Sequence, residues 1–370
     1  MANSFTNVIP QLLAQGLVAL RQQSIMARIV NRGYDALSGE KGSTIDVPIP
    51  SAVVVGDVAP AATPPAVTSE LSPTKVSIQL NKWKEASFYL TDKEMIESMN
   101  GVIPMEASEA AKALANQIDS DILALYKDIY GFVGTPAVTP FGLDTTAYLL
   151  GRKVLAQQLA PMEPRYMIID PTAEANALAL RAFQDASFRG DAAGIINGQI
   201  GMKLGALWAM DQNVPIHTAG TWSAGTATGT AGTKAVTING GTGSILVGDI
   251  VLFAGDTQTY VCTGATGTAP TTAITVEPAL KTSPSTSAIT FKASHAVNLL
   301  FHRDAFALAM RPFAGADPMN LGNYSSMVDP ISGIALRLEV TREFKRTRFS
   351  YDVLYGVATA RRELAVRIAG

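Results

Sequence analysis

The chain has 370 residues, of which 47% are hydrophobic and 16% are charged, and its formal net charge is −2. This charge balance excludes a strongly basic protein that binds nucleic acid through its global charge. The hydrophobic content excludes disorder of the whole chain, and the length fits two or three compact units. Because a charge-poor surface is a solubility liability for a monomer, we expect other copies of the chain to cover much of it.

The single cysteine, Cys262, excludes an internal disulfide and a cysteine-cluster zinc site. No basic leader precedes an apolar run, and no stretch approaches the roughly 18 apolar residues of a membrane span. We therefore expect synthesis in the cytoplasm and no membrane partner.

Apolar residues at helical spacing predict an amphipathic helix within residues 5–30. This helix packs either on its own domain or, as an arm, on a neighbouring subunit. Its apolar positions are Leu12, Leu13, Leu17, Leu20, Ile25, Ile29 and Val30.

Two alternating segments predict an antiparallel hairpin over residues 42–90, with an Ala- and Pro-rich tip between them. An isolated two-stranded hairpin is marginal in water, so the parent domain or another chain must cover it. We expect another chain, so that Ile78→Asp spares monomer folding and impairs assembly. The apolar positions of the two strands are Ile45, Val47 and Ile49, and Val76, Ile78 and Leu80.

Residues 104–130 carry the clearest helical pattern, and Gly131 follows as a stop. At about 1.5 Å per residue this helix is on the order of 40 Å long. Asp119 and Asp121 lie two positions apart on it and are expected to face different ways. Its apolar stripe consists of Leu114, Ile118, Ile122, Leu125 and Ile129.

Residues 141–215 are typical of an α/β unit, which resumes at residues 295–330. We predict helices at 145–159 and 172–183, with Thr172 as N-cap of the second, and a strand at 166–169. Between the two parts, residues 216–294 are rich in Thr, Gly, Ala and Ser. Short strands and turn residues there predict an inserted β-barrel or sandwich that folds alone. The predicted strands are Ala235–Ile238, Ile250–Phe253, Thr259–Cys262, Ala273–Val276 and Ala288–Phe291.

Residues 331–370 predict a closing antiparallel pair around a basic turn that contains Lys345, Arg346 and Arg348. The arginines of this segment form either local ion pairs or contacts with acidic neighbours, whether adjacent subunits or packaged nucleic acid.

No catalytic, metal or cofactor motif stands out from the sequence. The three histidines, His217, His295 and His302, lack metal-ligand spacing, and we interpret them as structural. Walker and nucleophile-elbow motifs are missing as well, so we expect a protein that is not an enzyme and binds no cofactor.

The order of arm, long hairpin, long helix, α/β unit with a β insertion and closing strand pair resembles a known family. That family is the major capsid protein of tailed double-stranded DNA phages, which has the HK97-type fold. Three segments carry a narrower resemblance to the short-tailed-phage coat proteins with an inserted β-barrel. They are V-G-D-I-V-L-F-A-G (Val247–Gly255), Y-G-V-A-T-A-R-R-E (Tyr355–Glu363) and F-R-G-D-A-A-G-I (Phe188–Ile195).

The resemblance implies an α+β capsid fold with an inserted all-β domain. Its parts are an N-terminal arm (1–41), an extended hairpin loop (42–90), a spine helix with the peripheral domain (91–140), an axial domain (141–215 and 295–330), the inserted β-barrel (216–294) and peripheral-domain strands with a C-terminal axial segment (331–370).

The resemblance further implies a virion protein that self-assembles, as hexamers and pentamers, into an icosahedral shell around phage DNA. Implied partners are other copies, a scaffolding protein, a portal, possible decoration proteins and non-specifically packaged DNA. The candidate subunit contacts are Val76, Ile78, Leu80, Trp83, Arg346 and Arg348.

Two alternatives belong to other classes. A surface-layer or tail protein, which the Thr- and Gly-rich stretch favours, predicts tubes or sheets. A hydrolase with a β-barrel carbohydrate module needs two carboxylates in one pocket.

Overall fold

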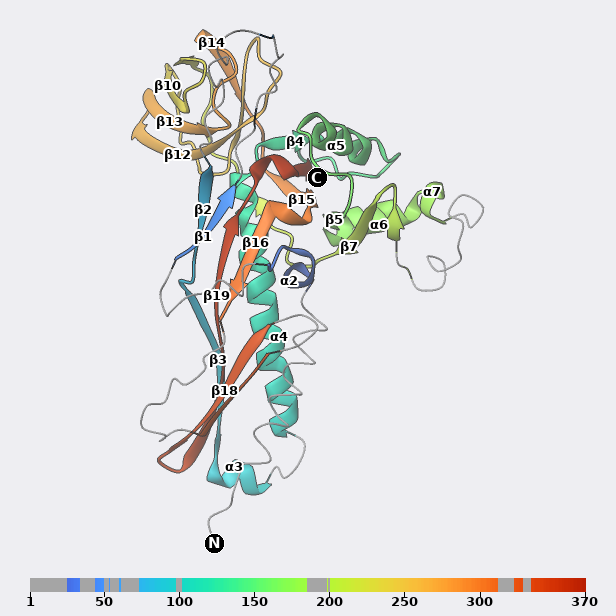
Figure 1. Cartoon of the computed structure of the whole chain (residues 1–370), viewed down its shortest axis with the longest axis vertical. Coiled ribbons are helices and arrows are strands. Elements are labelled where there is room, and N and C mark those ends of the chain that lie inside the picture. The colour runs from blue at the N-terminus through green and yellow to red at the C-terminus, as the bar shows by residue number, and fades with distance from the viewer. Residues whose placement is uncertain are drawn as a thin grey trace.

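A long helix and a long antiparallel sheet run along the longest axis of the molecule, and a β-barrel lies at one end (Figure 1). The computed structural model describes residues 25–33, 44–49, 53, 60, 73–97, 102–184, 198, 200–311, 323–328 and 334–370. The predicted arm residues before Ile25, most of the hairpin tip and the segment Phe188–Ile195 lie outside these described residues.

The long helix α4 (Val102–Leu123) continues as the 3₁₀ segment η3 (Ala124–Asp128). The predicted apolar stripe is confirmed, because Leu114, Ile118 and Ile122 are buried in the main core. The α-helix ends earlier than predicted, since its last turns tighten into 3₁₀ geometry. At about 1.5 Å per residue, the α-helical part is about 33 Å long rather than about 40 Å.

A five-stranded antiparallel sheet lies along α4, with β19 at its centre (Figure 1). One side of β19 pairs with β18 and β16, and the other side pairs with β3. The short helix α3 (Asp92–Glu97) follows β3 directly. The strands are β3 (Lys82–Thr91), β16 (Phe306–Met310), β17 (Asn323–Val328), β18 (Ala335–Glu343) and β19 (Arg346–Thr359).

The two aspartates of α4 face different ways, as predicted. Asp121 accepts a hydrogen bond of 2.6 Å from the Tyr355 hydroxyl, which joins α4 to β19. Asp119 accepts from the backbone N–H groups of Ile25 (2.8 Å) and Met26 (3.2 Å), at the start of α2 (Met26–Ile29). The same helix therefore anchors both the sheet and the first described segment of the chain.

The predicted hairpin pairs β1 (Thr44–Ile49) with β2 (Thr74–Gln79), with Ile45 opposite Ile78. Its apolar face is covered by its own chain. Ile78 and Leu80 are buried in a cluster with Ala307 and Ala309 of β16. The expectation that Ile78 and Leu80 are free for a neighbouring subunit is therefore wrong for the hairpin base, whereas Val76 is half-exposed.

A seven-stranded mixed sheet forms the second unit of the main body. The predicted strand and the first predicted helix are present, but the second is interrupted at Leu180 and forms two helices. It begins after Asp170, whose side chain accepts from Thr172 N–H, so Thr172 is not the N-cap. Three helices accompany this sheet: α5 (Thr146–Gln157), α6 (Pro171–Ala179) and α7 (Arg181–Gln184). The strands are β4 (Gly131–Val133), β5 (Arg165–Ile169), β6 (Gly201–Lys203), β7 (Ala206–Met210), β8 (Ile216–His217), β15 (His295–His302) and β20 (Ala365–Ala369). Two 3₁₀ segments are η4 (Arg303–Ala305) and η5 (Arg362–Leu364).

Six strands between β8 and β15 close into a barrel with its own apolar core. All five strands predicted in this stretch are present, some with shifted ends. The barrel strands are β9 (Thr226–Gly229), β10 (Ala235–Asn239), β11 (Ile250–Phe253), β12 (Tyr260–Thr268), β13 (Thr271–Glu277) and β14 (Ser285–Phe291).

Candidate functional site

Trp83, Arg346 and Arg348 lie on the face of the five-stranded sheet that points away from α4. Trp83 of β3 is 62% exposed and donates its indole N–H to Asp352 at 2.8 Å. Arg346 and Arg348 lie on β19 itself, because the chain reverses at residues 344–345, one step before the predicted position. That these side chains contact a neighbouring subunit stays a prediction.

The four arginines of β18 and β19 are paired with acidic side chains of the same chain. Arg348 pairs with Glu85, Arg346 with Glu343 and Arg342 with Asp92. A two-pronged bond joins Arg337 to Asp352. Local ion pairs are therefore present at these four arginines, and such pairs leave little unbalanced positive charge for phosphate groups.

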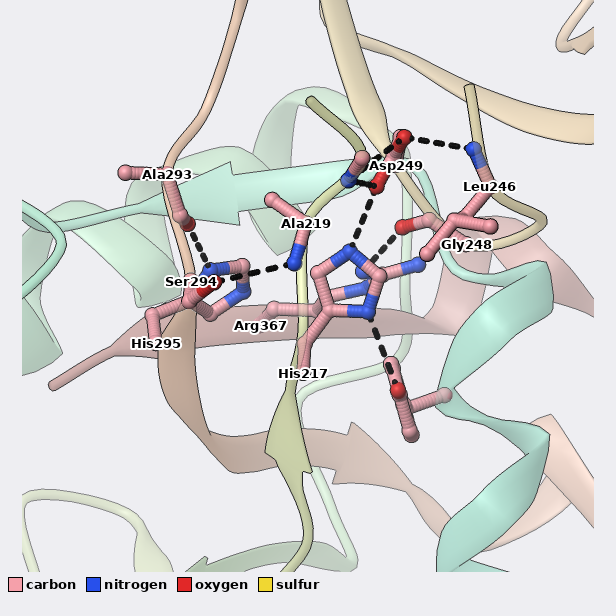
Figure 2. Close-up of polar contacts among 11 residues, drawn as sticks. His217, Ala219, Leu246, Gly248, Asp249, Ala293, Ser294, His295 and Arg367 are labelled. Atoms are coloured by element: carbon pink, nitrogen blue, oxygen red, sulfur yellow. Dashed lines mark hydrogen bonds and ion pairs between the residues drawn. The ribbon is translucent and has the colours of Figure 1, made fainter. Parts of the chain in front are cut away.

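A cluster of polar side chains is buried at the seam between the barrel and the main body (Figure 2). His217 of β8 contacts the Tyr126 hydroxyl through Nδ1 (3.0 Å) and the Asp249 carboxylate through Nε2 (2.9 Å). A neutral tautomer with the proton on Nε2 satisfies both bonds, since an ionised carboxylate only accepts. We call Tyr126, His217, Asp249, His295 and Arg367 the seam cluster.

Asp249 precedes β11 and also fastens the chain segment that leads into the barrel. Its carboxylate accepts from Gly220 N–H (3.1 Å) and from Leu246 N–H (2.8 Å). A Cβ at Gly220 would lie only 2.3 Å from the Ser244 carbonyl oxygen, so this close approach requires glycine. The carboxylate thus links β8, the connecting segment and the barrel.

Arg367 of β20 is fully buried in the seam cluster. Its guanidinium donates to the Gly248 carbonyl at 2.8 Å and lies 4.9 Å from the centre of the Tyr126 ring. Burial lowers the pKa of Arg367 to about 9, against the opposing effects of Tyr126 and nearby carboxylates. Burial also lowers the pKa of His295 to about 4, and the positive charge of Arg367 adds to this. A neutral His295 therefore suits the seam.

Further contacts make the seam broad. Phe132 and Ala369 of the body form an apolar cluster with Ile250 and Val261 of the barrel. Arg362 of the body pairs with Glu277 of β13 at 2.6 Å. The barrel is therefore attached by apolar, charged and hydrogen-bonded contacts together.

Binding chemistry is sparse in the described residues. Within these ranges, no group of three or more His, Cys, Asp and Glu side chains is arranged to hold a metal ion. Three surface hollows are lined by described residues, and each has at most one carboxylate, Glu174 in one and Asp144 in another. These hollows therefore lack the acid pair that the hydrolase alternative needs. None of the helices described combines the length and apolar character needed to cross a bilayer.

A family model described as phage capsid protein matches residues 73–307, which is more than half of the chain. The chain belongs to the phage capsid protein family. No curated protein matches the sequence of this capsid protein.

Solved structures from phages are similar to the capsid protein in fold. The structure titled "Capsid structure of the Cyanophage P-SCSP1u" is 13% identical, with a TM-score of 0.54, covering 94% of this chain and 88% of that one. "Mycobacterium phage Che8" is 16% identical, with a TM-score of 0.52 and coverage of 93% and 90%. "Gordonia phage Cozz" is 12% identical, with a TM-score of 0.50 and coverage of 93% and 85%.

Sequence reasoning missed the seam cluster of the capsid protein. Tyr126, His217 and Asp249 come from distant parts of the sequence, and no spacing pattern links them. The one available signal was the isolated Arg367 between apolar neighbours in a strand-like segment. The motif around Gly356 also has a structural reason, because a Cβ there would lie 2.3 Å from the Gln79 carbonyl oxygen. Glycine at this position lets the hairpin lie close on β19.

Proposed function

We propose that this capsid protein is the major shell subunit of a tailed phage, and that copies self-assemble as hexamers and pentamers into an icosahedral shell around double-stranded DNA. Membership of the phage capsid protein family is the observation that carries the proposal. The elongated body, in which α4 runs beside the five-stranded sheet, is consistent with a wall element (Figure 1).

In the HK97-type arrangement we assign α4 as the spine and β1–β2 as the base of the extended loop. The five-stranded sheet is then the peripheral domain, the seven-stranded sheet is the axial domain, and the barrel is the inserted domain. The domain bounds given in the sequence analysis remain our proposal for this division.

We further propose that the protein performs no catalysis. The polar groups that the fold gathers make structural bonds: Asp249 joins three segments and Asp121 joins α4 to β19. Because the arginines of the sheet are paired with carboxylates of the same chain, contact with packaged DNA is weak and non-specific. A scaffolding protein, a portal and decoration proteins are the further partners we propose.

Expression of the full chain, alone and with the phage's scaffolding protein, followed by negative-stain electron microscopy, tests the proposal. We expect round shells of uniform diameter. Tubes or flat sheets would favour the tail or surface-layer alternative, and monomers under every condition would contradict assembly.

A further inference from the structure

The loop between α5 and β5, residues 158–164, presents apolar side chains to solvent from a rigid base. Leu159 is 89% exposed and Met162 is 61% exposed. Leu159 has a φ of 59°, in the left-handed region, which costs a leucine roughly 1–2 kcal/mol. Glu163 beside them is exposed, and no ion pair is found for it among the described residues.

Buried side chains hold this loop from beneath. Arg165 donates to the carbonyl oxygens of Pro161 (2.7 Å) and Ala160 (2.8 Å). The Nε2 atom of His302, on β15, lies 3.2 Å from the Glu163 carbonyl oxygen. The backbone that carries Leu159, Met162 and Glu163 is therefore held in place, so little backbone entropy is lost when they bind. We call these three residues the α5 knob.

A hollow of about 310 Å³ lies between α5 and the barrel. Its apolar lining includes Phe132, Leu150 and Leu252, and its two charged groups are Lys153 and Lys292. Lys292 lies over the Phe132 ring at 5.5 Å, and neither lysine has an ion-pair partner in the described part of the chain. We call this the α5–barrel hollow.

We propose that the α5 knob of one copy docks into the α5–barrel hollow of the next copy. Leu159 and Met162 would displace water from the apolar lining, and Glu163 would pair with Lys153 or Lys292. The charges are complementary, since the hollow has two lysines and no carboxylate. The knob and the hollow consist of different residues, although Gln157, which lines the hollow, lies only two positions before Leu159. The contact is therefore head-to-tail, and it closes a ring where neighbouring copies are related by one fifth or one sixth of a turn.

This inference rests on the proposed shell function and names one contact within it. It also gives the barrel a role, because Leu252 and Lys292 bring the barrel into the interface. The broad seam that fixes the barrel on the body then fixes one wall of the docking site.

Cross-linking of the assembled protein tests the contact. A Met162→Cys, Lys292→Cys variant is treated with a short bis-maleimide. Native Cys262 does not compete, because it is buried and burial raises the pKa of its thiol to about 11. We expect a ladder of covalent oligomers that ends at five and six copies. The matched control is Met105→Cys with Lys292→Cys, since Met105 is similarly exposed but lies on α4. Product at least tenfold above this control supports docking.

Charge reversal is a second, independent test of the contact. Glu163→Lys should slow assembly at least tenfold, and Lys153→Glu with Lys292→Glu in the same chain should restore it. Glu106→Lys makes the same charge change on an exposed residue of α4 and should have little effect. Shells without the ladder, or a product that stops at dimers, would overturn the docking inference and leave the shell function standing. A ladder without shells would support docking and contradict the closed shell.

Discussion

Truncation of Ile78 should destabilise the isolated subunit, because the hairpin base is part of its core. Ile78 is 0% exposed, and its cluster consists of four hairpin side chains that face small alanines. These alanines cannot fill the space that Ile78→Ala leaves. A buried Ile→Ala change costs about 2–5 kcal/mol, and we expect about 3 kcal/mol here. The matched control Val76→Ala, at a half-exposed position of the same strand, should cost about 1 kcal/mol.

Hydrogen exchange on the unassembled subunit measures this effect at residues 74–79. A loss of about 3 kcal/mol corresponds to exchange about 100-fold faster at these amides. Urea unfolding of the same samples reports whether the whole subunit loses stability. If Ile78→Ala and Val76→Ala behave alike in both assays and only Ile78→Ala lowers shell yield, the residue is a contact and our reasoning is wrong.

Three further predictions concern the hairpin and the seam. Gly356→Ala should place a methyl group against the Gln79 carbonyl oxygen and destabilise the hairpin by about 2 kcal/mol. Hydrogen exchange at the β2 amides should become faster while the barrel amides stay protected, and unchanged exchange in β2 would contradict this. Asp249→Ala leaves the His217 and backbone donors without their acceptor and should lower the free energy of unfolding by at least about 3 kcal/mol. Asp249→Asn keeps one acceptor oxygen and should lower it less. Equal losses for the two variants would count against the hydrogen-bond argument. The pKa of His295 is about 4 in the folded state and 6.5 ordinarily, so the unfolded state takes up the proton first as the pH drops. The free energy of unfolding should therefore fall between pH 6.5 and pH 4, by at most about 3 kcal/mol. His295→Gln should flatten this pH dependence in urea unfolding.

Local periodicity predicted the elements of the capsid protein well. The stripe that contains Leu114 and Ile118 is buried along α4, and the alternation around Ile45 and Ile78 matches the observed pairing register. These patterns depend on neighbours three or four positions apart in a helix and two apart in a strand, so they are visible in a single sequence.

What covers an apolar face could not be predicted in the same way. The alternation around Ile78 indicates that one face of the hairpin is buried, but it carries no information about the partner, which is β16 of the same chain. The seam cluster could not be predicted for the same reason, because Tyr126 and His217 lie 91 positions apart in the sequence. Basic residues such as Arg348 were ambiguous because their partners, here Glu85, come from a distant strand.

Electron cryomicroscopy of the purified assembled protein tests the shell assignment most directly. The account predicts closed particles of icosahedral symmetry, in which each copy presents its barrel to a neighbour around the five-fold and six-fold positions. A reconstruction with helical or planar symmetry, or a protein that stays monomeric with its scaffolding protein present, would contradict it.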